Sequence, residues 1–218
     1  MKLVVFDLDG TLIDSVRHYV DTLTIAFNAV GQPVPDETTI RSVSGITARE
    51  AMGILAPGAT AERVEEVLQS YRTHYLERAG VHSEPLFVGA LDLLDRLQAE
   101  PATILAVATG KGYRSAVTLL ERHGILDRFD SIQTPDHNRG KPDPQMLDTA
   151  MARVGADRSN TVMIGDTVHD MRMARAARVA AVGVTWGYHT PDDLLSEGAG
   201  ALVSRFVELD PAINRLLE

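Results

Sequence analysis

The stretch Leu3-Val4-Val5-Phe6-Asp7-Leu8-Asp9-Gly10-Thr11 places an apolar run directly before two acidic residues. Four consecutive apolar residues predict a β-strand that is buried on both faces. The strand would carry Asp7 and Asp9 to its C-terminal tip, which is where open α/β sheets bind their ligands. Two carboxylates this close repel each other unless a cation or a shared proton relieves the repulsion. We therefore expect the chemistry of the protein at this tip.

Composition limits the function classes. The 218 residues are 44% hydrophobic and 23% charged, as in ordinary soluble globular proteins. A net charge of −9 and the lack of any Lys/Arg run argue against a nucleic-acid partner. The absence of cysteine excludes disulfides, thiolate catalysis and cysteine-ligated zinc. No apolar stretch has membrane-spanning length, and the N-terminus does not resemble a secretory signal, so we expect a cytoplasmic protein without a membrane partner.

Strand-like and helix-like segments alternate along most of the chain, which predicts an α/β fold with a doubly wound, Rossmann-like parallel sheet. The segment 103–108 has no polar alternation, as expected of a strand buried on both faces. The expected strands are 3–7, 103–108, 130–133, 161–165, 180–184 and 201–203, and the expected core helices are 90–99, 113–123, 144–154 and 168–177.

One region interrupts this alternation, because residues 15–84 contain no convincing strand. Helical periodicity predicts helices at 15–30, 47–55 and 61–78. The insertion leaves the core beside the acidic strand tip and returns to the same side. We therefore expect an all-helical cap, residues 15–84, over a core formed by residues 1–14 and 85–218. A lid so placed covers the tip and expels water from it.

Three further segments end or follow predicted strands and would meet the acidic tip at the same sheet edge. In Ala108-Thr109-Gly110-Lys111, a hydroxyl and a glycine amide are suited to holding a phosphate oxygen. In Gly140-Lys141-Pro142-Asp143-Pro144, the prolines place Lys141 on a short, stiff loop. In Gly165-Asp166-Thr167-Val168-His169-Asp170, the two acids lie one helical turn apart on one face. Each motif is weak alone, but their order and spacing together are specific.

The combination resembles the haloacid dehalogenase superfamily of aspartate-nucleophile phosphohydrolases. Asp7-x-Asp9-Gly10-Thr11 looks like its first motif, Thr109 its second, Lys141 its third and Gly165-Asp166-x-x-x-Asp170 its fourth. The helical insertion is similar to the small, C1-type cap of one subfamily. Within that subfamily, the chain looks most like phosphoglycolate phosphatases and related sugar-phosphate phosphatases, on the segments Asp14-Ser15, Gly140-Lys141-Pro142-Asp143-Pro144 and Gly183-Val184-Thr185-Trp186-Gly187-Tyr188.

The resemblance implies a Mg²⁺-dependent phosphatase that acts on a small phosphorylated metabolite, for example 2-phosphoglycolate. Mg²⁺ relieves the repulsion between a carboxylate nucleophile and a phosphate, and it prefers hard oxygen ligands. The implied roles are nucleophile for Asp7, proton donor and acceptor for Asp9, phosphate ligands for Thr109, Gly110 and Lys141, metal ligands for Asp7, Asp166 and the Asp9 backbone carbonyl, and orientation of metal-bound water for Asp170.

Residues outside these motifs have competing interpretations. Gly45 and Arg49, in a turn that starts a cap helix, are candidates for substrate specificity, and a plain solvated arginine is the equal alternative. We expect Lys111 to be a surface residue at a helix start, and His18 to lie on the surface or to pack within the lid. Histidines without a metal-ligand spacing are expected at the surface, namely His137, His169 and His189. Trp186 is expected to pack near Asp166.

Three other functions share parts of this pattern. A dehalogenase also uses an aspartate nucleophile, but it needs no metal, and Asp9 together with Asp166 argues against it. A β-phosphoglucomutase-like phosphotransferase would share every catalytic residue and differ only in its products. A non-enzymatic phospho-receiver module also combines acids, a threonine and a lysine around Mg²⁺, but it would be shorter and would lack the lid.

Overall fold

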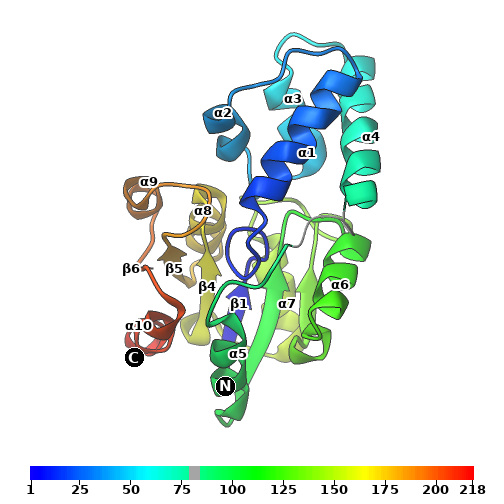
Figure 1. Ribbon diagram of the computed structural model, residues 1–218. Helices are drawn as coiled ribbons and strands as arrows, with labels where there is room; N and C mark the ends of the chain where they lie inside the picture. Colours follow the sequence, from blue (N-terminus) through cyan, green and yellow to red (C-terminus); the bar gives the residue numbers. More distant parts are fainter. Residues whose placement is uncertain (79–83) are drawn as a thin grey trace.

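The computed structural model of the protein describes residues 1–78 and 84–218. Its centre is a parallel sheet of six strands in the order β3-β2-β1-β4-β5-β6 (Figure 1). Every strand pair in this sheet is parallel, so the predicted α/β class and sheet type are confirmed. The strands are β1 (Lys2–Phe6), β2 (Thr103–Ala108), β3 (Ser131–Gln133), β4 (Thr161–Gly165), β5 (Ala180–Val184) and β6 (Ala201–Val203).

Helices cover both faces of the sheet because alternate side chains of each strand point to opposite faces. Val4 and Phe6 of β1 pack in the cluster that includes α5 (Ala90–Ala99), α6 (Tyr113–Arg122) and α10 (Leu209–Leu217). Leu3 and Val5 pack on the other side with α7 (Gln145–Val154), α8 (Val168–Ala177) and α9 (Pro191–Ser196). The apolar run that opens the chain is therefore buried from both sides, as its composition predicts.

The strand order reverses between β1 and β4, and this reversal positions the site. The chain builds β2 and β3 on one side of β1 and then crosses to place β4 on the other. Beyond the last residue of β1, the backbone N–H of Asp7 donates to the Ile164 carbonyl of β4 at 2.9 Å. Ligands of doubly wound sheets bind at such a switch point, outside the carboxyl ends of the strands.

Between β1 and α5, the described residues form four helices, which make a separate layer above the strand ends (Figure 1). They have a core of their own, in which Leu23, Phe27, Met52 and Leu68 are fully buried. Residues 79–83 of the predicted insertion lie outside the described residues. The helices are α1 (Val16–Ala29), α2 (Glu37–Ser42), α3 (Ala48–Leu55) and α4 (Ala61–Arg78).

Three helices have no counterpart in the sequence analysis: α2, α9 and α10. Both α2 and α9 have six residues, fewer than two turns, so no apolar periodicity develops along them. In α10, Pro211 lies in the first turn, where its missing N–H costs nothing.

Within residues 1–78 and 84–218, no helix is both long and apolar enough to cross a membrane.

The packing of α5 can be tested with two substitutions in the same helix. Leu93 is fully buried against the sheet, whereas Leu91 is 44% exposed. We expect Leu93→Ala to lower the free energy of unfolding by about 2–5 kcal/mol, because it leaves a cavity in the core. Leu91→Ala is expected to change it by less than about 0.5 kcal/mol. Urea unfolding measures both, and equal losses would contradict the assigned orientation of the helix.

Candidate active site

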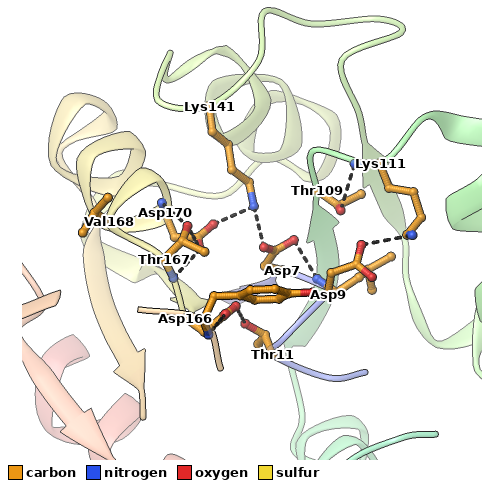
Figure 2. Close-up of polar contacts among 12 residues, drawn as sticks. Asp7, Asp9, Thr11, Thr109, Lys111, Lys141, Asp166, Thr167, Val168 and Asp170 are labelled. Atoms are coloured by element: carbon orange, nitrogen blue, oxygen red, sulfur yellow. Dashed lines mark hydrogen bonds and ion pairs between the residues drawn. The ribbon is translucent and has the colours of Figure 1, made fainter. Parts of the chain in front are cut away.

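Asp7 lies directly after β1 and is almost completely buried, with 1% of its surface exposed. Its Oδ1 accepts a hydrogen bond of 2.7 Å from the backbone N–H of Leu8. Its Oδ2 lies 2.9 Å from the Nζ of Lys141 (Figure 2). The backbone and one buried cation thus hold the carboxylate at the strand tip.

Asp166 follows β4 and is held by residues from two other segments. Its Oδ1 accepts from the Thr11 hydroxyl at 2.7 Å, and its Oδ2 accepts from the backbone N–H of Tyr188 at 2.8 Å. The Trp186 indole donates in turn to the Thr11 carbonyl at 3.1 Å and stacks on Phe206. Trp186 therefore packs beside the acidic site, as the sequence analysis expects. Gly10, at φ +81°, has no room for a side chain because a Cβ there would overlap Asp166.

Lys141 bridges two carboxylates from different segments. Its Nζ lies 2.6 Å from Asp170 Oδ1 as well as 2.9 Å from Asp7 Oδ2, and the lysine side chain has no exposed surface. The other oxygen of Asp170 accepts from the Thr167 hydroxyl at 2.7 Å and from the Thr167 backbone N–H at 3.1 Å. This capping box fixes Asp170 in the first turn of α8. Sequence reasoning did not foresee the contact between Lys141 and Asp170.

Burial and mutual repulsion shift the protonation of these groups. Burial raises the pKa of Asp7 to about 7, Lys141 opposes the shift, and Asp170 adds to it. Burial also raises the pKa of Asp166 well above its ordinary value, and the nearby Asp7 and Asp170 add to the rise. Burial alone would lower the pKa of Lys141, but Asp170 and Asp7 outweigh it and raise that pKa. The cluster therefore has more carboxylates than its one lysine compensates.

The acidic cluster fits a divalent metal ion. Asp7, Asp166 and Asp170 each offer a carboxylate oxygen, and these three atoms all lie within 4.8 Å of one another. With all three ionised and Lys141 protonated, an excess of two negative charges remains, which one divalent cation balances. Carboxylate oxygens are also the ligands that Mg²⁺ prefers.

Thr109 and Gly110 lie beside this cluster, at the end of β2. Thr109 is 1% exposed, and its hydroxyl accepts from the backbone N–H of Lys111 at 3.2 Å. A Cβ on Gly110 would lie 2.7 Å from the carbonyl oxygens of both Gly45 and Ile46 in the cap. Gly110 is thus needed for close contact with the cap, a reason that sequence analysis did not supply.

A cavity of about 700 Å³ lies between the cap and the core. Core residues Asp7, Asp9, Thr109 and Gly110 line it, whereas Lys141, Asp166 and Asp170 are not part of its wall. The cap residues in its lining include Gly45, Arg49, Tyr71 and Tyr75. The arrangement brings a cavity lined by both parts of the chain directly onto the carboxylate of Asp7.

The two cap candidates have different environments. Gly45, at φ +90°, approaches the core so closely that a Cβ would lie 2.8 Å from the Thr167 hydroxyl. Arg49 lines the cavity, but its guanidinium is paired with Glu65 at 2.5 Å and its side chain is 64% exposed. The glycine is thus part of the contact between cap and core, while the arginine is engaged with another cap helix.

The prediction for Lys111 is wrong, because the structure buries this side chain. Only 10% of it is exposed, and its Nζ lies 3.1 Å from Asp9 Oδ2 and 2.7 Å from the Tyr75 hydroxyl (Figure 2 shows the contact with Asp9). Burial acts to lower the pKa of Lys111, but Asp9, Tyr75 and Glu84 together raise it well above its ordinary value. Its partners are distant in sequence, so the local pattern carries no sign of them.

Four histidines, His18, His137, His169 and His189, lie in three different environments. His137 is exposed, as predicted, and His18 is buried against Tyr75 with ring centroids 5.0 Å apart, which agrees with packing in the lid. His169 and His189 are half-buried rather than at the surface, with centroids 5.8 Å apart. Val168 donates its backbone N–H to His189 Nδ1 at 3.0 Å. The loop after β5 therefore contacts the start of α8 through His189.

Comparison with known proteins gives a consistent picture. Residues 4–184 match the haloacid dehalogenase-like hydrolase family. The chain is 39% identical to a probable phosphatase, IndB, of Dickeya dadantii, over 99% of this chain and 95% of that protein. It is 33% identical to an N-acetylmuramic acid 6-phosphate phosphatase of Pseudomonas aeruginosa, over 100% of this chain and 96% of the relative. It is also 33% identical to a phosphoglycolate phosphatase of Caulobacter vibrioides, over 98% of this chain and 91% of that protein.

A solved structure has the same fold. The crystal structure of a hydrolase from Pseudomonas syringae matches with a TM-score of 0.87, covers 99% of each chain and is 26% identical in sequence. The likeness extends over the helical layer as well as the sheet, because nearly the whole chain is covered.

The close approach at Gly10 can be tested against a second glycine with a similar backbone. Gly124 has φ +64° and no atom near the place of a Cβ, so Gly124→Ala costs only the left-handed strain, about 1–2 kcal/mol. Gly10→Ala adds the overlap with Asp166, and we expect a further loss of about 1–3 kcal/mol. Urea unfolding compares the two variants, and equal losses would show that Asp166 is not held against Gly10.

The raised pKa of Asp7 predicts how stability depends on pH without metal. In the folded state this pKa is about 7, against 3.8 as its ordinary value. Between these two pH values, the folded protein keeps a proton that the unfolded chain has lost, so the free energy of unfolding falls as pH rises from about 4 to about 7. Urea unfolding in EDTA measures this slope. Asp7→Asn is expected to flatten it, and an unchanged slope in that variant would contradict the assignment.

Proposed function

The chain belongs to the haloacid dehalogenase-like hydrolases and is a phosphoric monoester hydrolase, and we propose that it hydrolyses a small phosphomonoester through a phosphorylated Asp7. One observation carries this proposal: the carboxylate of Asp7 opens onto a cavity between cap and core while Lys141 and two further carboxylates lie behind it. We assign the core to residues 1–14 and 85–218, and the cap to residues 15–84.

The reaction needs two steps. In the first, a carboxylate oxygen of Asp7 attacks phosphorus, the bond to the leaving oxygen breaks, and Asp9 gives its proton to that oxygen. In the second, Asp9 takes a proton from water, the water oxygen attacks phosphorus, and the bond to Asp7 breaks to release phosphate. Asp9 suits both steps because it lines the cavity and its side chain is 25% exposed.

The groups around Asp7 would bind the phosphoryl oxygens and hold the cofactor. Thr109, the Gly110 amide and Lys141 would stabilise the charge that builds on phosphorus. Asp7, Asp166 and the Asp9 backbone carbonyl would ligate Mg²⁺, and Asp170 would orient its bound water. When bound, the ion lowers the repulsion between the phosphate and the carboxylate nucleophile.

The substrate class is set by the cavity that the cap closes. Relatives act on N-acetylmuramic acid 6-phosphate and phosphoglycolate, which differ greatly in size. A cavity of about 700 Å³ lies within the range of small-molecule sites and accommodates either compound. We propose a sugar phosphate or a phosphorylated carboxylic acid, with Gly45 and Arg49 as candidate specificity residues at the cap side of the cavity.

The nucleophile is tested by phosphate release from a panel that includes 2-phosphoglycolate, N-acetylmuramic acid 6-phosphate and several sugar phosphates. Asp7→Asn removes the attacking oxygen, and we expect kcat to fall by about 10³-fold or more. The matched control is Asp157→Asn, an exposed acid before β4 at the opposite sheet edge, which should keep full activity. Metal-dependent turnover retained by Asp7→Asn would disprove the assignment.

Removal of metal separates the remaining alternatives. EDTA is expected to abolish phosphate release, and Mg²⁺ should restore it, whereas a dehalogenase would release halide from a haloacid with or without metal and would release no phosphate. Product analysis on sugar phosphates distinguishes a phosphatase from a mutase, because a mutase would form an isomeric sugar phosphate through a bisphosphate rather than free phosphate. A long-lived phosphorylated Asp7 without turnover would instead indicate a receiver module.

A further inference from the structure

We propose that Lys111, held in place by Tyr75 of the cap, is a positioning residue that aims the carboxyl group of Asp9 at the leaving oxygen of the substrate. This inference rests on the proposed function, in which Asp9 donates and accepts the proton. Lys111 belongs to none of the roles assigned so far. It lies two residues after Thr109, on the side of Asp9 away from the paired Lys141 and Asp170 (Figure 2).

Lys111 is fixed from both sides. Its Nζ lies 3.1 Å from Asp9 Oδ2 and donates to the Tyr75 hydroxyl at 2.7 Å. The same ammonium lies 4.5 Å from the centre of the Tyr75 ring, a distance at which a cation is attracted to the ring face. The core supplies Asp9 and Lys111, whereas Tyr75 comes from α4, so the contact crosses between cap and core.

The hydroxyl of Tyr75 is held in turn by the segment that returns from the cap. It donates to Glu84 Oε1 at 3.0 Å, and Glu84 is 2% exposed and lies 3.7 Å from Arg122. Because the hydroxyl donates its one hydrogen to Glu84, its oxygen is left to accept from Lys111. A chain of contacts thus links Arg122 to Asp9 through Glu84, Tyr75 and Lys111. Within it, the Tyr75 hydroxyl accepts a hydrogen bond from Lys111 and donates one to Glu84.

This arrangement decides which oxygen of Asp9 faces the substrate. The Nζ of Lys111 lies 3.1 Å from Oδ2, so the ammonium fixes the position of this oxygen. Asp9 lines the cavity, and because Oδ2 is paired with Lys111, we assign the transferred proton to the other oxygen, Oδ1. Once Asp9 has given that proton to the leaving oxygen, Lys111 stabilises the carboxylate that remains, because the opposite charge is already in place.

A purely structural role for Lys111 predicts a different result from a role through Asp9. If the lysine only neutralised a buried charge, its loss would slow every substrate by the same factor. If it positions the proton donor, its loss slows only those substrates whose leaving oxygen needs a proton. An alkyl phosphate has such an oxygen, whereas p-nitrophenolate leaves without protonation.

The test compares kcat of Lys111→Met on an alkyl phosphate turned over by the wild type and on p-nitrophenyl phosphate, both with Mg²⁺. We expect kcat to fall about 10–100-fold on the alkyl phosphate and less than about 3-fold on p-nitrophenyl phosphate. The matched control is Lys2→Met, at the N-terminal end of β1 and paired with Glu100, which should leave both values unchanged. Equal losses on the two substrates would overturn the inference.

A milder variant tests the same idea if Lys111→Met does not fold. Tyr75→Phe keeps the ring and removes the hydroxyl that Lys111 contacts, and we expect a smaller loss, about 3–10-fold, again confined to the alkyl phosphate. Tyr71→Phe, a neighbouring cap tyrosine whose hydroxyl makes no hydrogen bond to Lys111, should show no such dependence on the leaving group. A loss shared equally by both substrates in Tyr75→Phe would again count against the inference.

Failure of the inference differs from failure of the proposed function. A wild-type protein that releases phosphate, with Lys111→Met equally impaired on both substrates, disproves only the role of Lys111. A wild-type protein that releases phosphate from no compound of the panel in the presence of Mg²⁺ counts against the proposed function, and the contact is then tested by unfolding. Asp9→Asn and Lys111→Met should change the free energy of unfolding non-additively if the two side chains are paired. Additive changes would show that no such pair exists.

Discussion

The buried ammonium of Lys141, shared by Asp7 and Asp170, is the interaction on which the site depends. Three carboxylates converge where β1 and β4 end, and one lysine cannot balance them. Such a cluster is costly in a low-dielectric interior unless more positive charge arrives. The carboxylates are crowded because the switch point of the sheet brings two acid-bearing strand ends side by side. The same geometry that destabilises the metal-free cluster would favour binding of a divalent cation.

Close contacts without side chains hold this arrangement together. Gly10 lets the first loop lie against Asp166, and Gly110 lets the loop after β2 lie against the cap backbone at Gly45 and Ile46. A side chain at either core position would separate surfaces that must touch. The glycines therefore allow neighbouring segments of the site to approach each other closely, whereas the charged residues provide its chemistry.

The sequence predicts well what depends on neighbours along the chain. The strands β1, β2, β4 and β5 are identified from apolar runs, and the helices α1 and α4 from periodicity, because these patterns are local. The proximity of Asp7, Lys141 and Asp166 was also predictable, since parallel strands end at one edge. The environment of Lys111 was not predictable, because Asp9 lies about a hundred residues away and Tyr75 belongs to the inserted helices. A lysine at a helix start looks the same in sequence whether it faces solvent or a buried tyrosine.

The two lysines of the site have different partners, and we infer that they serve different steps of the reaction. Lys141 faces the carboxylate that would bond to phosphorus, and its partners both belong to the core. Lys111 faces the acid that would serve the leaving group, and one of its partners belongs to the cap. The core alone can therefore preorganise the residues that would bind the phosphoryl group. The position of the proton donor, Asp9, depends in addition on where the cap lies relative to the core. A substrate that draws the cap onto the core would complete the second half of the site, so binding energy from the leaving group would be used in the chemical step.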